Sequence, residues 1–544
     1  MRYSIIVVVL IGFFLRIVAL ADYPAGFSAD EVGQGYTAYS ILNTGADEWG
    51  EPFPVAPRSY GDYRAPLYTY LTIPSITAFG LNEFAVRLPN AILGTLAIAV
   101  LYFLCKELFR DKKIGIFASF LLAVSPWHIA LSRGAFEPNL PTLIIPLGIL
   151  VFLKARANKN YMYAAALCFG LGLFSYYSFR VLFPAIAVIL FILRKPAIAK
   201  HKTAFMMLLL FVLMAVYTMF TGASTRLIDV SIVGESSWQA LSDDRYEAVL
   251  MGLPDTIARI FNNKLTYVVT KFSKNYLSYF SPQFLFTEGA GEATYGLVPG
   301  SGLLYPLELL FITVGLIYII INKLYKDVSF KLILAMLVIA PVPAALATGP
   351  GMAANRAAVM LPWLTIISAI GIYAISKRLS NKYVPVLLVG YFLVSLVIFL
   401  EGYFFHAPRD NARSMGYGWR EAAEYLRSGE PFFERIIISK GFSEPQMFVA
   451  FYLQINPTVV QRSSVDWLRY EGEGLKFVDQ LGIYSLGKFV FKGIDTHELR
   501  SGSTLVMGRP EEFGETTPDH VVYYPDGEPA IYFVSSEETY AKNK

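Results

Sequence analysis

Long apolar segments separated by short polar loops fill most of residues 1–403. Most of these segments approach or reach the roughly 17–25 residues that an apolar helix needs to cross a bilayer. The pattern predicts a polytopic α-helical membrane protein with about 11 transmembrane helices. The predicted spans are Tyr3–Leu20, Leu88–Leu104, Ile114–Leu131, Leu140–Leu153, Tyr161–Tyr176, Phe179–Leu193, Thr203–Phe220, Leu303–Ile321, Phe330–Ala347, Ala357–Ile375 and Val384–Tyr403.

Two long polar stretches, Phe27–Leu81 and Thr221–Ser301, interrupt this pattern. They are the cores of two predicted outer loops, residues 22–87 and 221–302. The triplet Ala19-Leu20-Ala21 resembles a signal-peptidase site. The apolar run before it is long for a signal peptide, so we expect it to remain as the first span.

From residue 404 onward the pattern changes to short alternating runs and two helical segments. Short runs rich in β-branched and aromatic residues are typical of strands. The sequence therefore predicts a transmembrane domain over residues 1–403 and an extracytoplasmic α/β domain over residues 404–544. The expected strands are Arg435–Ser439, Lys488–Lys492, Thr504–Met507, Val521–Tyr524 and Ala530–Val534, and the expected helices are Gly418–Ser428 and Glu444–Leu453.

Loop charges predict the orientation. Five short loops, which begin at Lys106, Lys154, Arg194, Lys323 and Lys377, together hold 17 Lys and Arg residues and only three acids. By the positive-inside rule these loops are cytoplasmic. The N-terminus is then cytoplasmic, the C-terminal domain is outside, and a multi-pass location in the plasma (inner) membrane is expected.

Composition agrees with the membrane class. Charged residues make up 16% of the chain and mean hydropathy is +0.47, whereas soluble proteins average about 25% charged residues. Both cysteines, Cys105 and Cys168, lie in apolar runs, so no disulfide is expected. The five histidines are scattered and indicate no metal cluster.

Asp30 and Glu31 form an adjacent pair of acids near the start of the first outer loop. A carboxylate at the outer face can act as a general base towards a hydroxyl group. The alternative is that a long polar loop contains such a pair by chance. We interpret both residues as catalytic candidates, with Asp30 as the base.

Arg64 lies in an aromatic segment with Tyr63, Pro66 and Tyr68. A guanidinium at the membrane interface, flanked by tyrosines and close to a proline, suits a lipid phosphate. The alternative is an ordinary interfacial aromatic belt with an arginine that reaches for the headgroups. The tyrosines are expected to support or contact the substrate.

Three further arginines, Arg133, Arg180 and Arg356, occupy short outer loops against the positive-inside bias. An anionic ligand shared by several loops would explain them, and we treat them as candidates for binding a donor phosphate. The alternatives are headgroup contacts or a local pair such as Arg133 with Glu137, at helical spacing.

With these residues in place, the chain resembles polyprenyl-phosphate-sugar-dependent glycosyltransferases with the GT-C fold. Its nearest likeness is to bacterial relatives of the protein O-mannosyltransferases and the lipid A aminoarabinose transferases. The resemblance places Asp30 at the family's catalytic position and Arg64 at the basic residue that is usually Lys. It also relates Glu83 to the entry into the second span, Glu137 to a second acidic motif that usually carries Asp, and Arg356 with Pro362 to a late motif.

The chain departs from the aminoarabinose transferases at their metal site. Those enzymes have a glutamate just before the basic residue and a histidine in the later outer loop. Here Tyr63 stands at the first position, and Thr221–Ser301 contains no histidine. That metal site is therefore not carried over; no cofactor is certain, and a divalent metal is left open.

The resulting hypothesis is an inverting glycosyltransferase. It would move a monosaccharide from a polyprenyl-phosphate donor to a hydroxyl of a protein, lipid or glycan at the outer membrane face, with membrane lipids and no nucleic acid as partners. A transporter or flippase of a lipid-linked or small solute is the main alternative. It explains the many spans equally well but not the acids in a long outer loop, because transporters place ionisable groups near the midplane. A non-catalytic scaffold, in which Asp30 would be dispensable, is the third.

Overall fold

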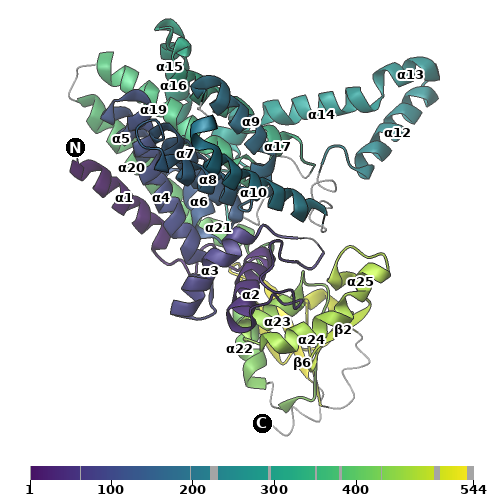
Figure 1. Cartoon of the computed structure of the whole chain (residues 1–544). Coiled ribbons are helices and arrows are strands. Elements are labelled where there is room, and N and C mark those ends of the chain that lie inside the picture. Colours follow the sequence, from purple (N-terminus) through teal and green to yellow (C-terminus); the bar gives the residue numbers. More distant parts are fainter. Residues whose placement is uncertain are drawn as a thin grey trace.

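The computed structural model describes residues 2–61, 63–195, 198–220, 231–291, 296–348, 352–378, 383–429, 432–494 and 503–535. A helical body occupies one end of the molecule and a smaller domain with a sheet occupies the other (Figure 1). Parts of the predicted loop 221–302, namely residues 221–230 and 292–295, lie outside the described residues.

Each predicted span coincides with a helix or a bent pair of helices. These are α1 (Arg2–Ile17), α4 (Glu83–Phe109), α5 (Lys112–Val124) with α6 (Pro126–Arg133), α7 (Leu140–Lys154), α8 (Asn160–Gly172), α9 (Tyr177–Arg194), α10 (Lys202–Thr218), α15 (Pro306–Ile321), α16 (Val328–Ile339) with α17 (Val342–Ala345), α19 (Leu361–Arg378) and α20 (Tyr383–Glu401).

Six helical segments of the described residues are long and apolar enough to cross a membrane, and the pair α5–α6, bent by 57°, makes a seventh. Pro126 accounts for the bend, because proline cannot continue the hydrogen-bond ladder of the preceding helix. Three shorter apolar helices, Tyr3–Ile17, Lys202–Thr218 and Pro306–Ile321, add to these. The multi-pass membrane class is confirmed, while the number of 11 crossings stays a prediction.

The closest packing within the body joins α15 to α19. A Cβ atom on Gly315 would collide with the carbonyl oxygen of Ile367, and one on Gly371 would collide with that of Phe311. Small residues allow the two backbones to touch, which is how helices gain dispersion energy where the solvent is as apolar as the side chains.

The first polar stretch forms two helices, α2 (Ala29–Thr44) and α3 (Pro66–Phe79). Most of α2 is buried, because it lies between the helical body and the C-terminal domain (Figure 1). The second polar stretch contains α12 (Glu235–Leu250), α13 (Asp255–Phe261) and α14 (Lys264–Ser278), which project sideways from the body.

The C-terminal domain contains a six-stranded mixed sheet in the order β2-β3-β1-β4-β6-β5. Strand β1 pairs in parallel with β3 and β4, and the outer pairs are antiparallel. The strands are β1 (Arg435–Ser439), β2 (Ile483–Leu486), β3 (Phe489–Lys492), β4 (Thr504–Gly508), β5 (His520–Tyr523) and β6 (Pro529–Ser535), and the longer helices are α22 (Trp419–Gly429), α23 (Pro445–Tyr452) and α24 (Pro457–Trp467). The fold class read from the sequence is confirmed, although β2 and α24 were not expected.

Specific contacts fix this domain to the helical body. Arg420 of α22 forms ion pairs with Glu83 (2.7 Å) and Asp22 (3.0 Å). The hydroxyl of Tyr36 in α2 donates to the carbonyl oxygen of Ile455 at 2.6 Å. The first polar loop is therefore held by the helical body on one side and by the C-terminal domain on the other.

Replacing Gly371 tests the contact between α15 and α19. Gly371→Ala is expected to lower the thermal midpoint of the purified protein, because overpacking of this kind costs about 1–3 kcal/mol. Gly390→Ala in α20 is the matched control, since a Cβ there meets nothing within 4 Å. Equal midpoints for the two variants would contradict the packing described here.

Candidate active site

The N-terminus of α2 is built by a capping box. The Ser28 hydroxyl accepts a hydrogen bond from the Glu31 backbone N–H, and the Ser28 N–H donates to the Glu31 carboxylate at 3.1 Å. Such boxes satisfy two of the free N–H groups at a helix start. Asp30 and Glu31 also lie where the helix dipole favours negative charge.

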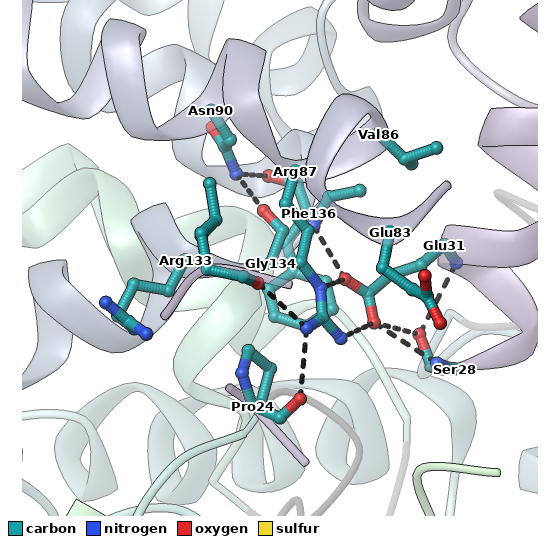
Figure 2. Close-up of polar contacts among 12 residues, drawn as sticks. Pro24, Ser28, Glu31, Glu83, Val86, Arg87, Asn90, Arg133, Gly134 and Phe136 are labelled. Atoms are coloured by element: carbon teal, nitrogen blue, oxygen red, sulfur yellow. Dashed lines mark hydrogen bonds and ion pairs between the residues drawn. The ribbon is translucent and has the colours of Figure 1, made fainter. Parts of the chain in front are cut away.

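Glu31 is fully buried and paired with Arg87 of α4, which is also fully buried. The Arg87 Nε lies 2.8 Å from Oε1 and Nη2 lies 3.2 Å from Oε2 of Glu31. Figure 2 shows this pair, with Ser28 on the other side of the carboxylate. The backbone N–H of Ala135 donates to Glu31 at 3.0 Å. Through these contacts Glu31 holds Arg87, Ser28 and Ala135 in place, so it has the surroundings of a positioning residue.

Arg87 also binds the segment that leads from α1 to α2. Its guanidinium donates to the carbonyl oxygens of Leu20, Ala21, Pro24 and Gly26, at 2.6–3.3 Å. Arg133, also fully buried, donates to the carbonyl of Leu15 in α1, to the carbonyls of Ala19 and Tyr23 in the same segment, and to the hydroxyl of Tyr403. The contacts of Arg133 favour a structural role over phosphate binding.

Asp30, next to Glu31 in the chain, faces the other way. Its side chain is 54% exposed, and its Oδ1 lies 3.7 Å from Nη2 of Arg64, which is only 4% exposed. Arg64 packs against Gly33, one turn further along α2, and a Cβ at that position would collide with the guanidinium. The structure thus brings the predicted base and the predicted phosphate-binding arginine together.

The second acidic motif reaches the same part of α2. Gln34 donates to the Glu137 carboxylate at 3.3 Å and accepts a hydrogen bond from Thr69 of α3. Because Gln34 follows Asp30 by four residues, the two lie on one face of the helix. Glu137 is therefore close to the candidate site through Gln34.

The other predicted residues take supporting places. The carbonyl of Tyr63 accepts a hydrogen bond from Tyr177 at 2.8 Å. Tyr68 is buried and donates to the carbonyl of Val86 at 2.8 Å. Glu83 binds Arg420 and the hydroxyl of Tyr452, so it connects the helical body to the C-terminal domain.

Arg180 lies on the first turn of α9, beside the segment that carries Arg64. Its Nε donates to the carbonyl of Leu173, and its guanidinium stacks on Phe174 and Tyr177. Its Nη1 is buried without a hydrogen-bond partner among the described residues. Arg356 is half-buried and donates to the carbonyl of Thr348 at 2.6 Å; residues 349–351, between them, lie outside the described chain.

A second buried acid, Glu48, lies behind Arg64. Its Oε1 accepts a hydrogen bond from Thr37 of α2 at 2.9 Å. Its Oε2 and the hydroxyl of Tyr60 are buried without hydrogen-bond partners among the described residues. Burial and the neighbouring Asp47 raise the pKa of Glu48 to about 8, against the opposing effect of the Arg64 charge.

Two cavities lie near the helical body, and neither is lined by Asp30 or Arg64. One of about 640 Å³ lies between the helical body and the C-terminal domain, with Gly26, Glu83, Arg420 and Tyr452 in its wall. The other, of about 330 Å³, is apolar and lies among α7, α8, α9 and α10. No group of three or more His, Cys, Asp or Glu side chains that could hold a metal occurs in the described part of the chain.

Comparisons with known proteins bear on the fold of the chain and on one of its segments. Residues 63–220 match the family model of dolichyl-phosphate-mannose-protein mannosyltransferases. No curated protein sequence matches the chain. The chain resembles the apo structure of ArnT from Cupriavidus metallidurans, with a TM-score of 0.52, 11% identity and coverage of 97% of each chain.

The same ArnT bound to undecaprenyl phosphate gives a TM-score of 0.50 at 12% identity, with coverage of 98% of this chain and 97% of that one. The archaeal oligosaccharyltransferase AglB from Archaeoglobus fulgidus, in complex with an inhibitory peptide and a dolichol-phosphate, gives a TM-score of 0.47 at 16% identity. That match covers 83% of this chain, which spans 63% of the length of AglB.

The chain therefore has the GT-C fold, which it shares with ArnT, and its residues 63–220 match the mannosyltransferase family model. The GT-C likeness drawn from the sequence is therefore confirmed at the level of the fold.

From the sequence alone, no role was predicted for three residues that lie at the candidate site. The position of Arg87 was a usable signal, because a charged residue directly before an apolar span suggests a functional role. Glu48 and Gln34 carried none, since their partners Thr37, Glu137 and Thr69 become neighbours only through the packing of α2.

Glu48 predicts a pH-dependent stability. Its usual pKa of 4.5 applies to the unfolded chain and about 8 to the folded one. The folded state therefore holds a proton between these values, and the stability this gives is complete below pH 4.5 and lost as the pH rises through 8. The thermal midpoint should fall from pH 6 to pH 9 more steeply in the wild type than in Glu48→Gln, which cannot ionise. Parallel pH profiles would contradict the burial of this acid.

Proposed function

We propose that the chain is an inverting glycosyltransferase that moves a monosaccharide from a polyprenyl-phosphate donor to a hydroxyl of a protein, lipid or glycan. The observation that carries the proposal is the pairing of Asp30 with Arg64. A solvent-facing carboxylate lies 3.7 Å from a nearly buried guanidinium at the start of one helix. The GT-C relationship supports a sugar transfer at this place.

Asp30 serves as the base. Its carboxylate accepts the proton of the acceptor hydroxyl while that oxygen attacks the anomeric carbon of the sugar. The bond from that carbon to the phosphate oxygen breaks, and its electron pair stays on the phosphate. A single displacement of this kind inverts the anomeric configuration. Asp30 is suited to this step because its neighbour Glu31 is held by Arg87, which fixes the start of α2.

Arg64 stabilises the charge that develops on the leaving phosphate. Fixed donors aimed at a developing charge supply a large part of many enzymatic rate accelerations. Arg180 joins it, because its neighbours Phe174 and Tyr177 contact the Arg64 segment at Leu67 and Tyr63. Arg356 is retained as a third candidate. Glu137 acts through Gln34 as a positioning residue.

The two cavities suit the two substrates. The apolar cavity among α7–α10 is lined by Phe183, Ala187 and Leu190 of α9, which share a helix face with Arg180 at three- and four-residue spacing. A lipid chain there would leave its phosphate near Arg180. The polar cavity between the domains is not lined by Asp30, so the acceptor is proposed to reach the exposed Asp30 from the side of the C-terminal domain. That side is proposed to be the outer face of the plasma membrane.

Asp30→Asn tests the base. The variant is expected to lose sugar transfer by about 10²–10⁴-fold, the usual contribution of general base catalysis, with an unchanged thermal midpoint because Asp30 is exposed. Radiolabelled polyprenyl-phosphate sugars would be incubated with wild type, Asp30→Asn and the control Glu51→Gln, whose carboxyl is exposed in the same loop. An active Asp30→Asn enzyme would falsify the assignment. Wild type that moves solute across vesicles and transfers no sugar would favour the transporter.

Arg64→Ala tests the phosphate contact. Loss of a charge-assisted hydrogen bond of about 1.5–3 kcal/mol should lower kcat/KM for the donor by roughly 10- to 100-fold. Arg64→Lys keeps the positive charge and should recover part of the loss. Arg58→Ala is the control, because Arg58 lies in the same loop but pairs with Tyr470 and Glu471. Donor kinetics equal to wild type in Arg64→Ala would refute this role.

A further inference from the structure

The helices α12, α13 and α14, residues 235–278 and here called the arm, expose an unusually apolar surface. Leu250, Met251, Ile260, Phe261 and Leu265 are each at least 65% exposed around the turn at the far end of the arm. No residue of α14 is buried. Soluble proteins rarely leave contiguous apolar patches of this kind open, and such patches mark protein or membrane contacts.

The sequence of α14 separates this apolar surface from a basic one. Leu265, Val269, Phe272 and Tyr276 recur at helical spacing and form one face. Lys271 and Lys274 are exposed on the opposite face. A helix with an apolar face and a lysine-bearing polar face is the pattern of helices that lie in a membrane interface.

The inner end of the arm is attached to a helical segment that could cross the membrane. The Tyr276 hydroxyl donates to the carbonyl of Val338 at 2.8 Å, and the Asn275 amide donates to that of Ala345 at 3.1 Å. Both acceptors lie in the second half of Val328–Ala345, which is long and apolar enough to cross the membrane. The last turns of α14 are therefore attached to the half of this segment that ends at Ala345.

The direction of the arm agrees with a position at the membrane surface. It leaves the helical body sideways and does not fold onto the C-terminal domain (Figure 1). The chain that follows it returns beside the entry to that domain, because Asn411 donates to the carbonyl of Leu297 at 2.7 Å. The arm and the C-terminal domain thus lie on the same side of the helical body.

We propose that the arm lies flat in the interface of the leaflet on the side of the C-terminal domain, with its apolar face among the acyl chains. Lys271 and Lys274 then meet lipid phosphates, which predicts firmer contact with anionic lipids. Lys264 is placed differently, because its ammonium group sits 4.7 Å from the centre of the Trp238 ring and helps to hold α14 against α12. This inference does not depend on the sugar-transfer chemistry.

Fluorescent labels on the two faces of α14 test the proposal. The full-length protein, with Cys105→Ala and Cys168→Ala, would receive Leu265→Cys on the apolar face or Thr270→Cys on the polar face as matched control. Each would be labelled with bimane in nanodiscs of phosphatidylcholine and phosphatidylglycerol holding one copy. Lipid-borne spin labels should quench the Leu265 site at least about twofold more than the Thr270 site, and aqueous iodide should do the reverse.

Equal quenching of both sites by iodide, with little quenching by the lipid spin label, would overturn the proposal. So would protection of the Leu265 site that occurs only when two copies share a disc, because the apolar face would then be an interface between copies. Ile260→Cys in α13 serves as a second apolar site if Leu265→Cys lowers the thermal midpoint. Weaker lipid quenching in discs of phosphatidylcholine alone would further support the role of Lys271 and Lys274.

Discussion

The buried ion pair between Arg87 and Glu31 is the interaction on which the rest of the site depends. Neither side chain is exposed, so loss of either partner would leave a buried charge, at a cost of about 3–5 kcal/mol. Such a pair is tolerated only when its remaining donors are used. Arg87 meets that condition through four carbonyl oxygens of residues 20–26. These carbonyls belong to non-helical chain beside the membrane body, where backbone groups need partners within the protein.

This pair also separates the roles of two adjacent acids. Consecutive residues of an α-helix point about 100° apart, so when Glu31 turns inward to Arg87, Asp30 turns outward. The capping box adds to the constraint, because Ser28 holds the same Glu31 carboxylate. Asp30 can therefore stay exposed at a fixed place, with Arg64 at its side and Gly33 leaving room for the guanidinium. A flexible loop with the same two acids would not offer this geometry.

The sequence predicted the helical body well because the apolar spans and charged loops are local patterns. It also predicted five of the six strands, and it singled out the segments around Asp30 and Arg64 as the candidate site. It did not predict that α2 would be mostly buried, since α2 is covered by partners such as Ile455, which lies 419 residues from Tyr36. The clamp role of Arg133 was missed for the same reason, because its acceptors in α1 lie more than 100 residues earlier. Side chains joined across such separations leave no periodic signal.

The low identity to ArnT and the shared fold follow from the same physics. Helices in a membrane need apolar surfaces and close backbone contacts such as Gly315 with Ile367, and many sequences satisfy both. The residues of a catalytic site are less free to vary, because a base and a phosphate-binding cation must be held at fixed places. In this chain α2 is held by the buried side chains of Arg87 and Glu48 and by the half-buried Glu137, while Asp30 stays exposed at the edge of the helix. Substitutions that change which sugar or acceptor is used are therefore expected in the cavity walls, whereas those behind α2 would change whether the site forms at all.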